Sequence, residues 1–316
     1  MAAMPAFSLP WGRRRLLLVV AGAATAAGAL AVLVVLARRL RLLLAGDVLL
    51  ADQGAYYTVA LQDRMLLTHN VRLLRFSLPD PSQRLGLRPG EHVYLHAHQG
   101  GRAVVRPYTP VSLCDKRGTF DLIVKVYVGD ASAAVPGGGV MSQYLDQLAP
   151  GDEIQVQGPK GRFVYEGRGR FALVRDPYRR LPPAVRLGLI AAGSGITPML
   201  QLLRHMFADP LDRTDVVMVD VNSTQDDIIA REELDGYAQL FSGNFSIWHV
   251  LSKLPATGAP ANFLQGRLTA EILAARLPPP GVDTMVLCCG PPRLISEVCK
   301  PALRDIGHSA EQVLIF

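Results

Sequence analysis

The hydrophobic pattern of this 316-residue chain changes once, at a segment with three prolines near residues 175–185. Before this segment, short apolar runs are separated by Gly, Pro and Asp, and residues 119–128 largely alternate apolar and polar side chains. This pattern predicts the antiparallel strands of a β-barrel. After the segment, four buried runs alternate with helical stretches, which predicts a parallel sheet with right-handed crossovers. We therefore expect domains at 56–174 and 186–316, joined by a linker at 175–185.

The individual elements can be placed by the same pattern. In the first domain we expect strands at 71–78, 92–96, 119–128 and 153–157 and a helix at 141–148. In the second we expect strands at 187–192, 216–221, 245–251 and 284–289, and helices at 198–207, 226–240, 269–276 and 294–306. Ligands of open α/β sheets bind at the carboxyl ends of the strands, so binding residues should follow these strands.

An uncharged stretch at 16–37 precedes both domains. As a helix it would span roughly 30 Å, the thickness of the hydrocarbon core of a bilayer. A cleaved secretory signal peptide is the alternative, because three arginines precede the stretch and its middle is rich in alanine. The length of the stretch and the Arg38-Arg39 pair after it favour a retained transmembrane helix. We expect a membrane anchor with basic flanks at 1–41 and a linker at 42–55.

The charge distribution argues against nucleic acid binding despite a net charge of +6. Six arginines precede Leu42, and all 27 acidic residues follow it, so the remaining 27 basic residues balance them. Four cysteines form no C-x-x-C pair, and no His/Cys cluster has zinc spacing, so we expect no metal site. Reduced thiols fit a cytosolic domain. Two glycosylation sequons, at Asn222 and Asn244, would matter only if the domain were lumenal.

A glycine-containing turn, Gly193-Ser194-Gly195-Ile196-Thr197-Pro198, follows the first buried strand of the second domain and opens a helix. Glycines let the backbone approach a pyrophosphate, and a helix N-terminus offers N–H donors and a positive dipole. Proline suits the first helical turn. The pattern lacks the third glycine of the usual dinucleotide fingerprint. By itself it indicates either nucleotide binding or a purely structural turn.

Two motifs in the first domain have chemistry suited to a phosphate-bearing ring compound. Within Arg106-Pro107-Tyr108-Thr109-Pro110, the arginine can grip phosphate, the tyrosine offers a flat face and the threonine a hydroxyl. An ordinary strand end is the alternative. Gly138-Gly139-Val140-Met141-Ser142 is a glycine turn into a helix, and therefore a second candidate anion site. Glycine flexibility with capping by Ser142 explains it equally well.

The last long strand ends in Cys288-Cys289-Gly290-Pro291-Pro292. At the carboxyl end of a parallel strand, a thiol could touch a nicotinamide ring. A buried cysteine that packs as a small apolar residue is the commoner situation.

These four motifs in this order resemble the NADH–cytochrome b5 reductase family, within the ferredoxin–NADP reductase-like flavoproteins. The stretches that carry the resemblance are 106–111, 121–127, 138–145, 193–200 and 289–292, and the resemblance covers about 57–316. It implies an FAD-binding β-barrel followed by a nicotinamide-binding α/β domain. It also implies that NADH gives a hydride to FAD, which then passes single electrons to cytochrome b5 or a similar haem protein.

The resemblance also implies roles for individual residues. Arg106 would hold the FAD pyrophosphate, Tyr108 would pack on the isoalloxazine and Thr109 would hydrogen-bond near its reactive edge. Pro107 would also belong to the cofactor-binding residues. The remaining flavin residues would be Ile123 and Lys125 in the pocket, and Gly139, Met141 and Ser142 at the pyrophosphate. Thr197 would sit between flavin and nicotinamide, with Thr109, Thr197 and Cys289 closest to the chemistry. The dinucleotide site would be shaped by Gly193, Gly195, Cys289, Gly290, Pro291 and Pro292, with Cys289 beside the nicotinamide. Pro198 and Phe316, which matches the family's terminal aromatic, would also bind cofactor.

Two departures from the family pattern affect function. Val140 stands where relatives often have lysine, which removes a positive charge near the flavin phosphates or the acceptor surface. Ser252-Lys253 stands where relatives often have Asp-Arg, so NADPH remains possible beside NADH, unless Asp220 or Asp226 discriminates against the 2′-phosphate. A reductase for another acceptor such as a quinone, and a redox-inactive membrane-tethered adaptor, are the alternative functions. We expect anchoring in the endoplasmic reticulum or mitochondrial outer membrane, with the catalytic domain in the cytosol.

Overall fold

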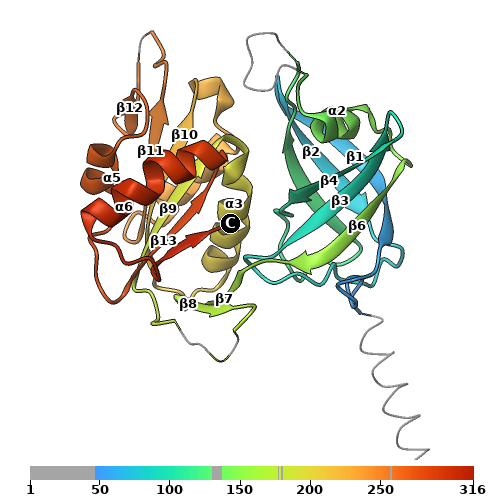
Figure 1. Cartoon of the computed structure of the whole chain (residues 1–316), viewed down its shortest axis with the longest axis horizontal. Coiled ribbons are helices and arrows are strands. Elements are labelled where there is room, and N and C mark those ends of the chain that lie inside the picture. The colour runs from blue at the N-terminus through green and yellow to red at the C-terminus, as the bar shows by residue number, and fades with distance from the viewer. Residues whose placement is uncertain (1–46, 130–136, 177, 179–180, 257) are drawn as a thin grey trace, which may run out of the picture. The chain divides into compact units, whose positions relative to one another are not determined.

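The first sheet of the computed structural model is antiparallel and has the strand order β4-β3-β6-β1-β2-β5 (Figure 1). Its strands are β1 (Tyr57–Thr68), β2 (Val71–Ser77), β3 (His92–Gln99), β4 (Arg102–Tyr108), β5 (Thr119–Lys125) and β6 (Glu153–Lys160). Inward side chains such as Leu74, Phe76, Leu95 and Leu122 are at most 1% exposed and form one core. The predicted antiparallel barrel domain is confirmed.

The structure describes residues 47–129, 137–176, 178, 181–256 and 258–316. The predicted anchor at 16–37 lies outside these residues. Within them, no helix is long and apolar enough to cross a membrane. Part of the predicted linker at 42–55 packs against the barrel, since Leu49 and Leu50 are buried and their N–H groups donate to the carbonyls of Arg84 and Leu85.

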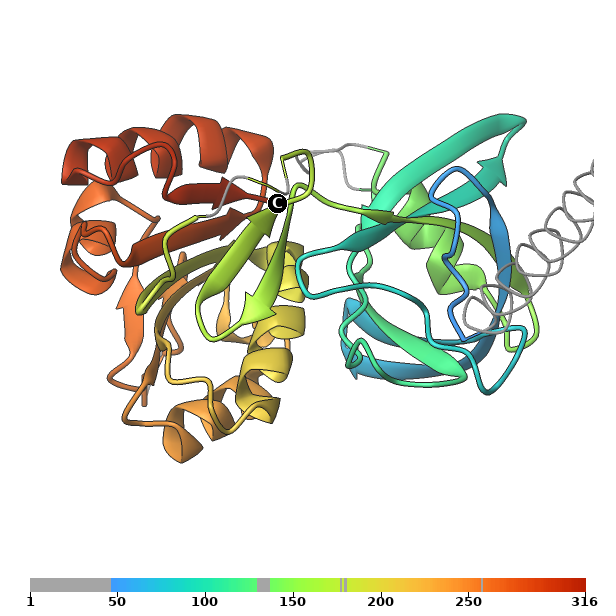
Figure 2. The same ribbon diagram turned by 90° about the horizontal axis from the view of Figure 1, so that it is seen from below.

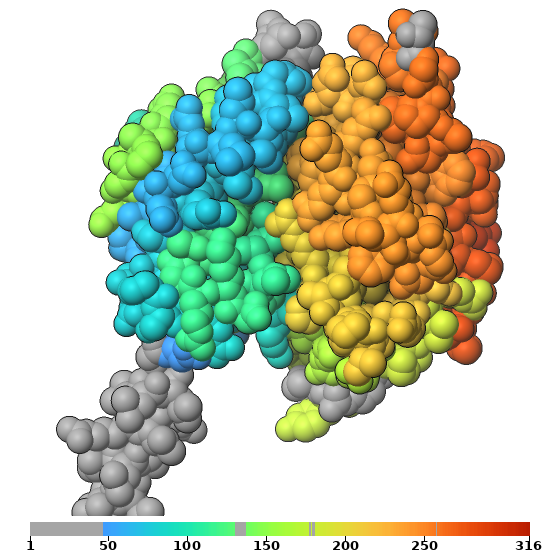
Figure 3. All heavy atoms as spheres, turned by 180° about the vertical axis from the view of Figure 1, so that it is seen from behind, coloured from blue at the N-terminus to red at the C-terminus, as the bar shows by residue number. Residues whose placement is uncertain are grey.

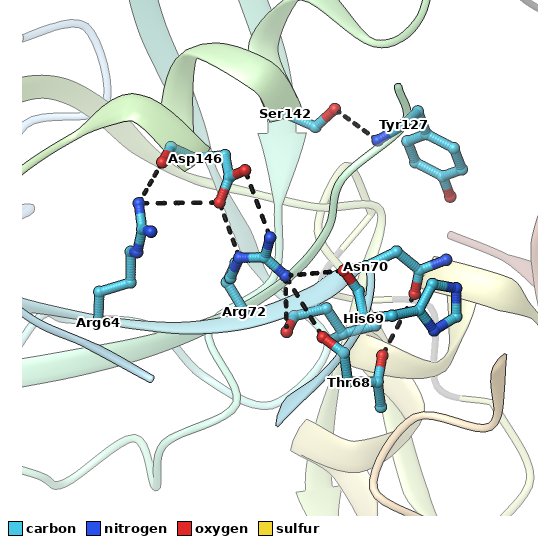
Figure 4. Close-up of polar contacts among 9 residues, drawn as sticks. Arg64, Thr68, His69, Asn70, Arg72, Tyr127, Ser142 and Asp146 are labelled. Atoms are coloured by element: carbon cyan, nitrogen blue, oxygen red, sulfur yellow. Dashed lines mark hydrogen bonds and ion pairs between the residues drawn. The ribbon is translucent and has the colours of Figure 1, made fainter. Parts of the chain in front are cut away.

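A short helix, α2 (Val140–Gln147), covers one end of the barrel close to β3, β4 and β5. Its inner face buries Met141 and Leu145 in the barrel core. Asp146 near its end accepts from Arg72 Nε of β2 at 2.7 Å, and Arg64 of β1 donates to the Asp146 carbonyl (Figure 4). The β1–β2 hairpin, blue in the surface view of Figure 3, therefore fixes the position of α2.

The second sheet is parallel, with the order β12-β11-β10-β9-β13-β14. Its strands are β9 (Arg186–Ala192), β10 (Asp215–Asn222), β11 (Phe245–Leu251), β12 (Phe263–Gln265), β13 (Thr284–Cys289) and β14 (Val313–Ile315). The turn η1 (Gly193–Gly195) leads into α3 (Ile196–Ala208), and η2 (Gln225–Asp227) precedes α4 (Arg231–Leu240). Helix α5 (Ala270–Arg276) follows β12, and a π-helical turn, η3 (Leu294–Cys299), runs into α6 (Lys300–Ile306). This confirms the predicted α/β domain.

Alternate residues of each parallel strand pack on opposite faces. On β9 and β13, Leu189 and Leu287 share a cluster with α3, whereas Ile190 and Val286 share one with α5 and α6. Figure 2 shows the red helices on one side of this sheet and the yellow helix on the other. Burial on both faces explains why these strands are continuous apolar runs in the sequence.

The short strands β12 and β14 were not predicted, and two further features differ from expectation. The helix predicted at 226–240 begins only at Arg231, because residues 225–227 form the separate turn η2 and Ala230 is left-handed, with φ 55°. The hairpin of β7 (Phe163–Gly167) and β8 (Arg170–Leu173) forms its own sheet. Its Phe163 and Phe171 share a cluster with Leu187 and Met199 of the second half of the molecule, by which we mean the part built on the parallel sheet, the first half being the barrel with α2. The domain limits at 174 and 186 stay predictions.

Candidate active site

The N-terminus of α2 fits the pyrophosphate of a dinucleotide. Its N-cap is Gly139, and no side chain caps the first N–H groups. Gly138 has φ +72°, and a Cβ there would come within 2.5 Å of the Tyr127 carbonyl oxygen, so the turn needs glycine. The helix also approaches β4, which carries Arg106. An uncapped helix start, close to a strand that carries an arginine, offers the kinds of donor that suit a phosphate.

Ser142 has a local partner on each side of its hydroxyl. Its Oγ donates to the Gly139 carbonyl at 2.9 Å. The same Oγ accepts from the Tyr127 N–H at 3.2 Å (Figure 4). The side chain therefore holds the glycine turn against the end of β5 instead of capping the helix. Its contact with pyrophosphate stays a prediction. That contact would be made by backbone N–H groups at the start of the helix.

The motif at the end of β4 presents side chains with different exposure. Arg106 and Pro107 are exposed, and among the described residues no carboxylate pairs with Arg106, whose Nη1 donates to the Val105 carbonyl. Tyr108 and Thr109 are half-buried. Burial, with a smaller contribution from Tyr127, raises the pKa of Tyr108, so its hydroxyl stays neutral at physiological pH. A free cation beside a neutral ring suits a phosphate and an aromatic ring system.

Strand β5 points its predicted flavin residues towards the second half of the molecule. Ile123 is buried in the cluster that also contains Met199 and Leu200 of α3. Lys125 Nζ donates to Asp227 Oδ1 at 2.8 Å. The flavin pocket predicted at these residues therefore lies where the two halves meet, although their contact with flavin stays a prediction.

The glycine turn after β9 and the end of β13 approach each other through backbone. A Cβ on Gly195 would lie 2.3 Å from the Cys289 carbonyl oxygen, and one on Gly290 would lie 2.9 Å from the Ala192 Cβ. Gly193 has φ +53° and open space around it. The sequence motifs at 193–198 and 288–292 thus form one site at the carboxyl edge of the sheet, where dinucleotides bind.

Helix α3 joins this edge to the barrel. Thr197 is 9% exposed, and its Oγ1 donates to the Ser194 carbonyl at 3.2 Å. One turn later, the buried Gln201 donates to the Pro110 and Glu91 carbonyls, both at 3.1 Å, and accepts from the Gly90 N–H at 2.8 Å. Residues four apart share a helix face, so Thr197 lies on the side that contacts the Thr109-Pro110 end of β4.

The remaining predicted residues differ in accessibility. Burial raises the pKa of the Cys289 thiol to about 12, so it is neutral at physiological pH and cannot act as a thiolate nucleophile. Pro198 is buried at the start of α3, whereas Pro291 and Pro292 are exposed. The Phe316 ring packs edge-to-face on the Phe163 ring, with 4.8 Å between the ring centroids, and this contact places Phe316 against β7.

Four residues that the sequence motifs did not single out for the site link the two halves. Gln201 is one, and its position as a polar residue inside the apolar run 198–203 was a usable signal. Arg204 donates to the Val111 carbonyl at 2.6 Å, Tyr127 donates to Ser194 Oγ at 3.0 Å, and Asp227 pairs with Lys125. Asp220, considered as a ribose-binding residue, is 1% exposed and accepts from Asn222 in a cluster with His249, so it does not reach the ligand edge.

Comparisons with known proteins agree with this geometry. Residues 58–165 match the model of the oxidoreductase FAD-binding domain, and residues 189–300 match that of the oxidoreductase NAD-binding domain. Rat NADH-cytochrome b5 reductase 3 is 40% identical over 85% of this chain and 89% of its own length. Human NADH-cytochrome b5 reductase 2 is 39% identical over 85% of this chain and 97% of its own length. The cytochrome b5 reductase domain of Ulva prolifera nitrate reductase is 28% identical, with a TM-score of 0.77 over 84% of this chain and 99% of that domain.

A β-barrel with an uncapped helix terminus, joined to a parallel sheet with a glycine turn at its ligand edge, defines an FAD- and nicotinamide-dependent oxidoreductase. Within that class, the identity over most of both chains shows that this protein belongs to the NADH-cytochrome b5 reductase family.

Proposed function

We propose that this protein is a membrane-anchored reductase that takes a hydride from NADH onto FAD and passes electrons singly to cytochrome b5 or a similar haem protein. The observation that carries the proposal is the match, along both domains, to reductases named for this donor and acceptor. When bound, FAD accepts a hydride and releases its two electrons one at a time.

The residues of this chain supply binding and orientation. Arg106 and the start of α2 hold the pyrophosphate of FAD, and Tyr108 supports the ring system. Gly193 has open space where a Cβ would lie and would admit the nicotinamide dinucleotide close to the backbone, whereas Gly195 lets the turn pack against the Cys289 carbonyl. Gln201 bonds α3 to the Pro110 carbonyl and the Gly90 N–H of the barrel, and so holds the helix that carries Thr197 against the segment that carries Thr109. Holding two reactants in such an arrangement lowers the activation barrier by removing orientational freedom.

Membrane attachment is supported by the uncharged stretch at 16–37 and its arginine flanks. A chain beginning at Leu42 should reduce a small artificial acceptor as fast as the full chain does. It should reduce membrane-bound cytochrome b5 more slowly, because co-anchoring raises the effective concentration. Equal rates of the two chains on membranes would count against the anchor.

A cytosolic domain on the endoplasmic reticulum or mitochondrial outer membrane is part of the same proposal. Asn244 is the informative sequon, because Asn222 is 7% exposed and donates its amide to Asp220. Mass spectrometry of the protein from cells should find Asn244 unmodified. A glycan there would place the domain in the lumen.

The acceptor is tested with a panel assayed on the full chain in vesicles: cytochrome b5, a soluble quinone and a small artificial acceptor. The highest kcat/KM should be obtained with cytochrome b5. Preference for the quinone would replace cytochrome b5 with the alternative acceptor class. A flavin-loaded protein inactive with all three would favour the adaptor.

A further inference from the structure

Asp227 lies between the two halves of the molecule, and its two carboxylate oxygens accept hydrogen bonds from different halves. Oδ1 accepts from Lys125 Nζ at 2.8 Å and from Asn70 Nδ2 at 3.5 Å, both of the barrel. Oδ2 accepts from the Thr224 N–H at 3.2 Å and from Thr224 Oγ1 at 2.9 Å, within its own turn η2. A single side chain thus closes a capping box in the nicotinamide half and binds the flavin half.

The contact is sheltered from solvent. The Lys125 side chain is 12% exposed and that of Asp227 is 14% exposed. Burial alone would raise the pKa of Asp227, but hydrogen bonds from Lys125 and Thr224 and the lysine charge lower it overall, so the carboxylate is ionised. Buried ion pairs add little net stability, because the cost of desolvating the charges offsets their attraction. When hydrogen bonds satisfy both carboxylate oxygens, however, such a pair holds its two segments in one relative position.

Both sides of the contact are attached to residues of the site. On the barrel side, Lys125 ends β5, and the next residue, Val126, donates its N–H to the Asn70 carbonyl at 2.7 Å. On the other side, η2 follows β10, where the carbonyls of Asn222 and Ser223 accept from the N–H groups of Ser252 and Lys253. Asp227 therefore connects the flavin strand β5 to the loops expected to hold the nucleotide ribose.

We propose that Asp227 is a positioning residue for hydride transfer, fixing the nucleotide-binding edge of the second half against strand β5 of the flavin half. This inference rests on the proposed function. A hydride moves only across a short, aligned approach, and a displacement of about 1 Å lowers such a rate by up to roughly 100-fold. Electron release to the acceptor involves no nicotinamide and does not depend on this contact.

The test is Asp227→Asn in the full, FAD-loaded chain, with the two half-reactions followed by stopped-flow absorbance of the flavin. Reduction by saturating NADH should slow about 10- to 100-fold. Reoxidation of chemically reduced enzyme by cytochrome b5 should stay within twofold of wild type. Without any turnover, hydrogen exchange should rise in peptides covering 119–128 and 222–230, and NAD⁺ should perturb the flavin spectrum less.

The matched control is Asp235→Asn, which removes the carboxylate of an ion pair with Arg231 that lies within α4 alone. It should leave both half-reactions and the exchange of these peptides unchanged. If Asp227→Asn does not retain FAD, Asp227→Glu, which keeps the charge but displaces the carboxylate, undergoes the same measurements.

Wild-type hydride transfer in the Asp227 variant, or equal slowing of both half-reactions, overturns the positioning role while leaving the proposed function intact. If NADH fails to reduce the flavin of the wild-type chain, the proposed function itself fails, and the inference fails with it.

Discussion

The barrel and the parallel sheet bury their strands in different ways. Barrel strand β3 alternates buried and partly exposed residues along most of its length, whereas β9 is buried at every position after its first. Predicted site residues differ accordingly. The barrel offers side chains at a strand end, such as Arg106, and the sheet offers backbone at glycine turns, such as Gly195. Substituting a site residue of the barrel should therefore mainly weaken cofactor binding, whereas substituting a site residue of the parallel sheet should mainly disturb packing.

The largest expected effect is that of Gly195→Ala in the sheet half. The new Cβ would lie 2.3 Å from the Cys289 carbonyl oxygen, so backbone must move. We expect a loss of about 3 kcal/mol in the free energy of unfolding, and weaker NADH binding, measured by denaturant unfolding and by KM. The control is Gly236→Ala in α4, where an added Cβ would meet nothing within 4 Å apart from the backbone of its own helix. It should stabilise the protein by about 0.5–1 kcal/mol, and a similar loss from both variants would contradict the account.

In the barrel half, Arg106→Ala should weaken FAD binding without unfolding the protein. A charge-assisted hydrogen bond is worth about 1.5–3 kcal/mol, so FAD should dissociate on dilution. The apoprotein should unfold within about 0.5 kcal/mol of wild type, since the side chain is exposed. Arg102→Ala, four residues earlier on β4, is the control and should keep its FAD. Flavin fluorescence after gel filtration measures both, and equal retention by Arg106→Ala and Arg102→Ala would remove Arg106 from the site.

The third prediction concerns the stability of the barrel half at low pH. Asp121 on β5 is 8% exposed, and Arg75 Nε and Lys116 Nζ both donate to its carboxylate at 2.7 Å. Burial alone would raise the pKa of Asp121, but these partners hold it below its ordinary value of 3.8. A depressed pKa stabilises the fold above 3.8, and this stabilisation disappears as the pH falls through the lower folded value.

Unfolding measured between pH 7 and pH 3 should therefore show a loss near the acid end that Asp121→Asn abolishes. At pH 7 the variant should be destabilised by about 2 kcal/mol. The surface variant Asp235→Asn should change stability by less than about 1 kcal/mol. If Asp121→Asn loses as much stability at low pH as the wild type does, groups other than Asp121 cause the loss.

The smallest effect is expected at the nucleotide edge. Ser252 and Lys253 are exposed after β11, and the buried Asp220 does not compete for the ribose. Ser252→Asp should raise the ratio of kcat/KM for NADH over NADPH about tenfold, which corresponds to about 1.4 kcal/mol. Lys253→Gln is the companion variant and should lower activity with NADPH alone. An unchanged ratio in Ser252→Asp would show that this residue does not face the ribose.

The sequence predicted the parallel half more closely than the barrel. Strands β11 and β13 have the predicted bounds, because burial on both faces makes each a continuous apolar run. A strand was expected before Arg106, but the bounds of β4 were not predicted, since five of its seven residues are exposed. The contacts of Gln201 and Asp227 with the barrel could not be predicted from the sequence either. They join residues more than 90 positions apart along the chain, and no local pattern encodes such pairing.

The most direct test of the central claim is an anaerobic titration of the purified full chain with NADH. The protein should be yellow, one equivalent of NADH should bleach one bound FAD, and the reduced enzyme should then reduce two molecules of cytochrome b5. This follows because a hydride carries two electrons and a haem accepts one. A colourless protein that reduces cytochrome b5, or a bound flavin that NADH leaves oxidised, would contradict the account.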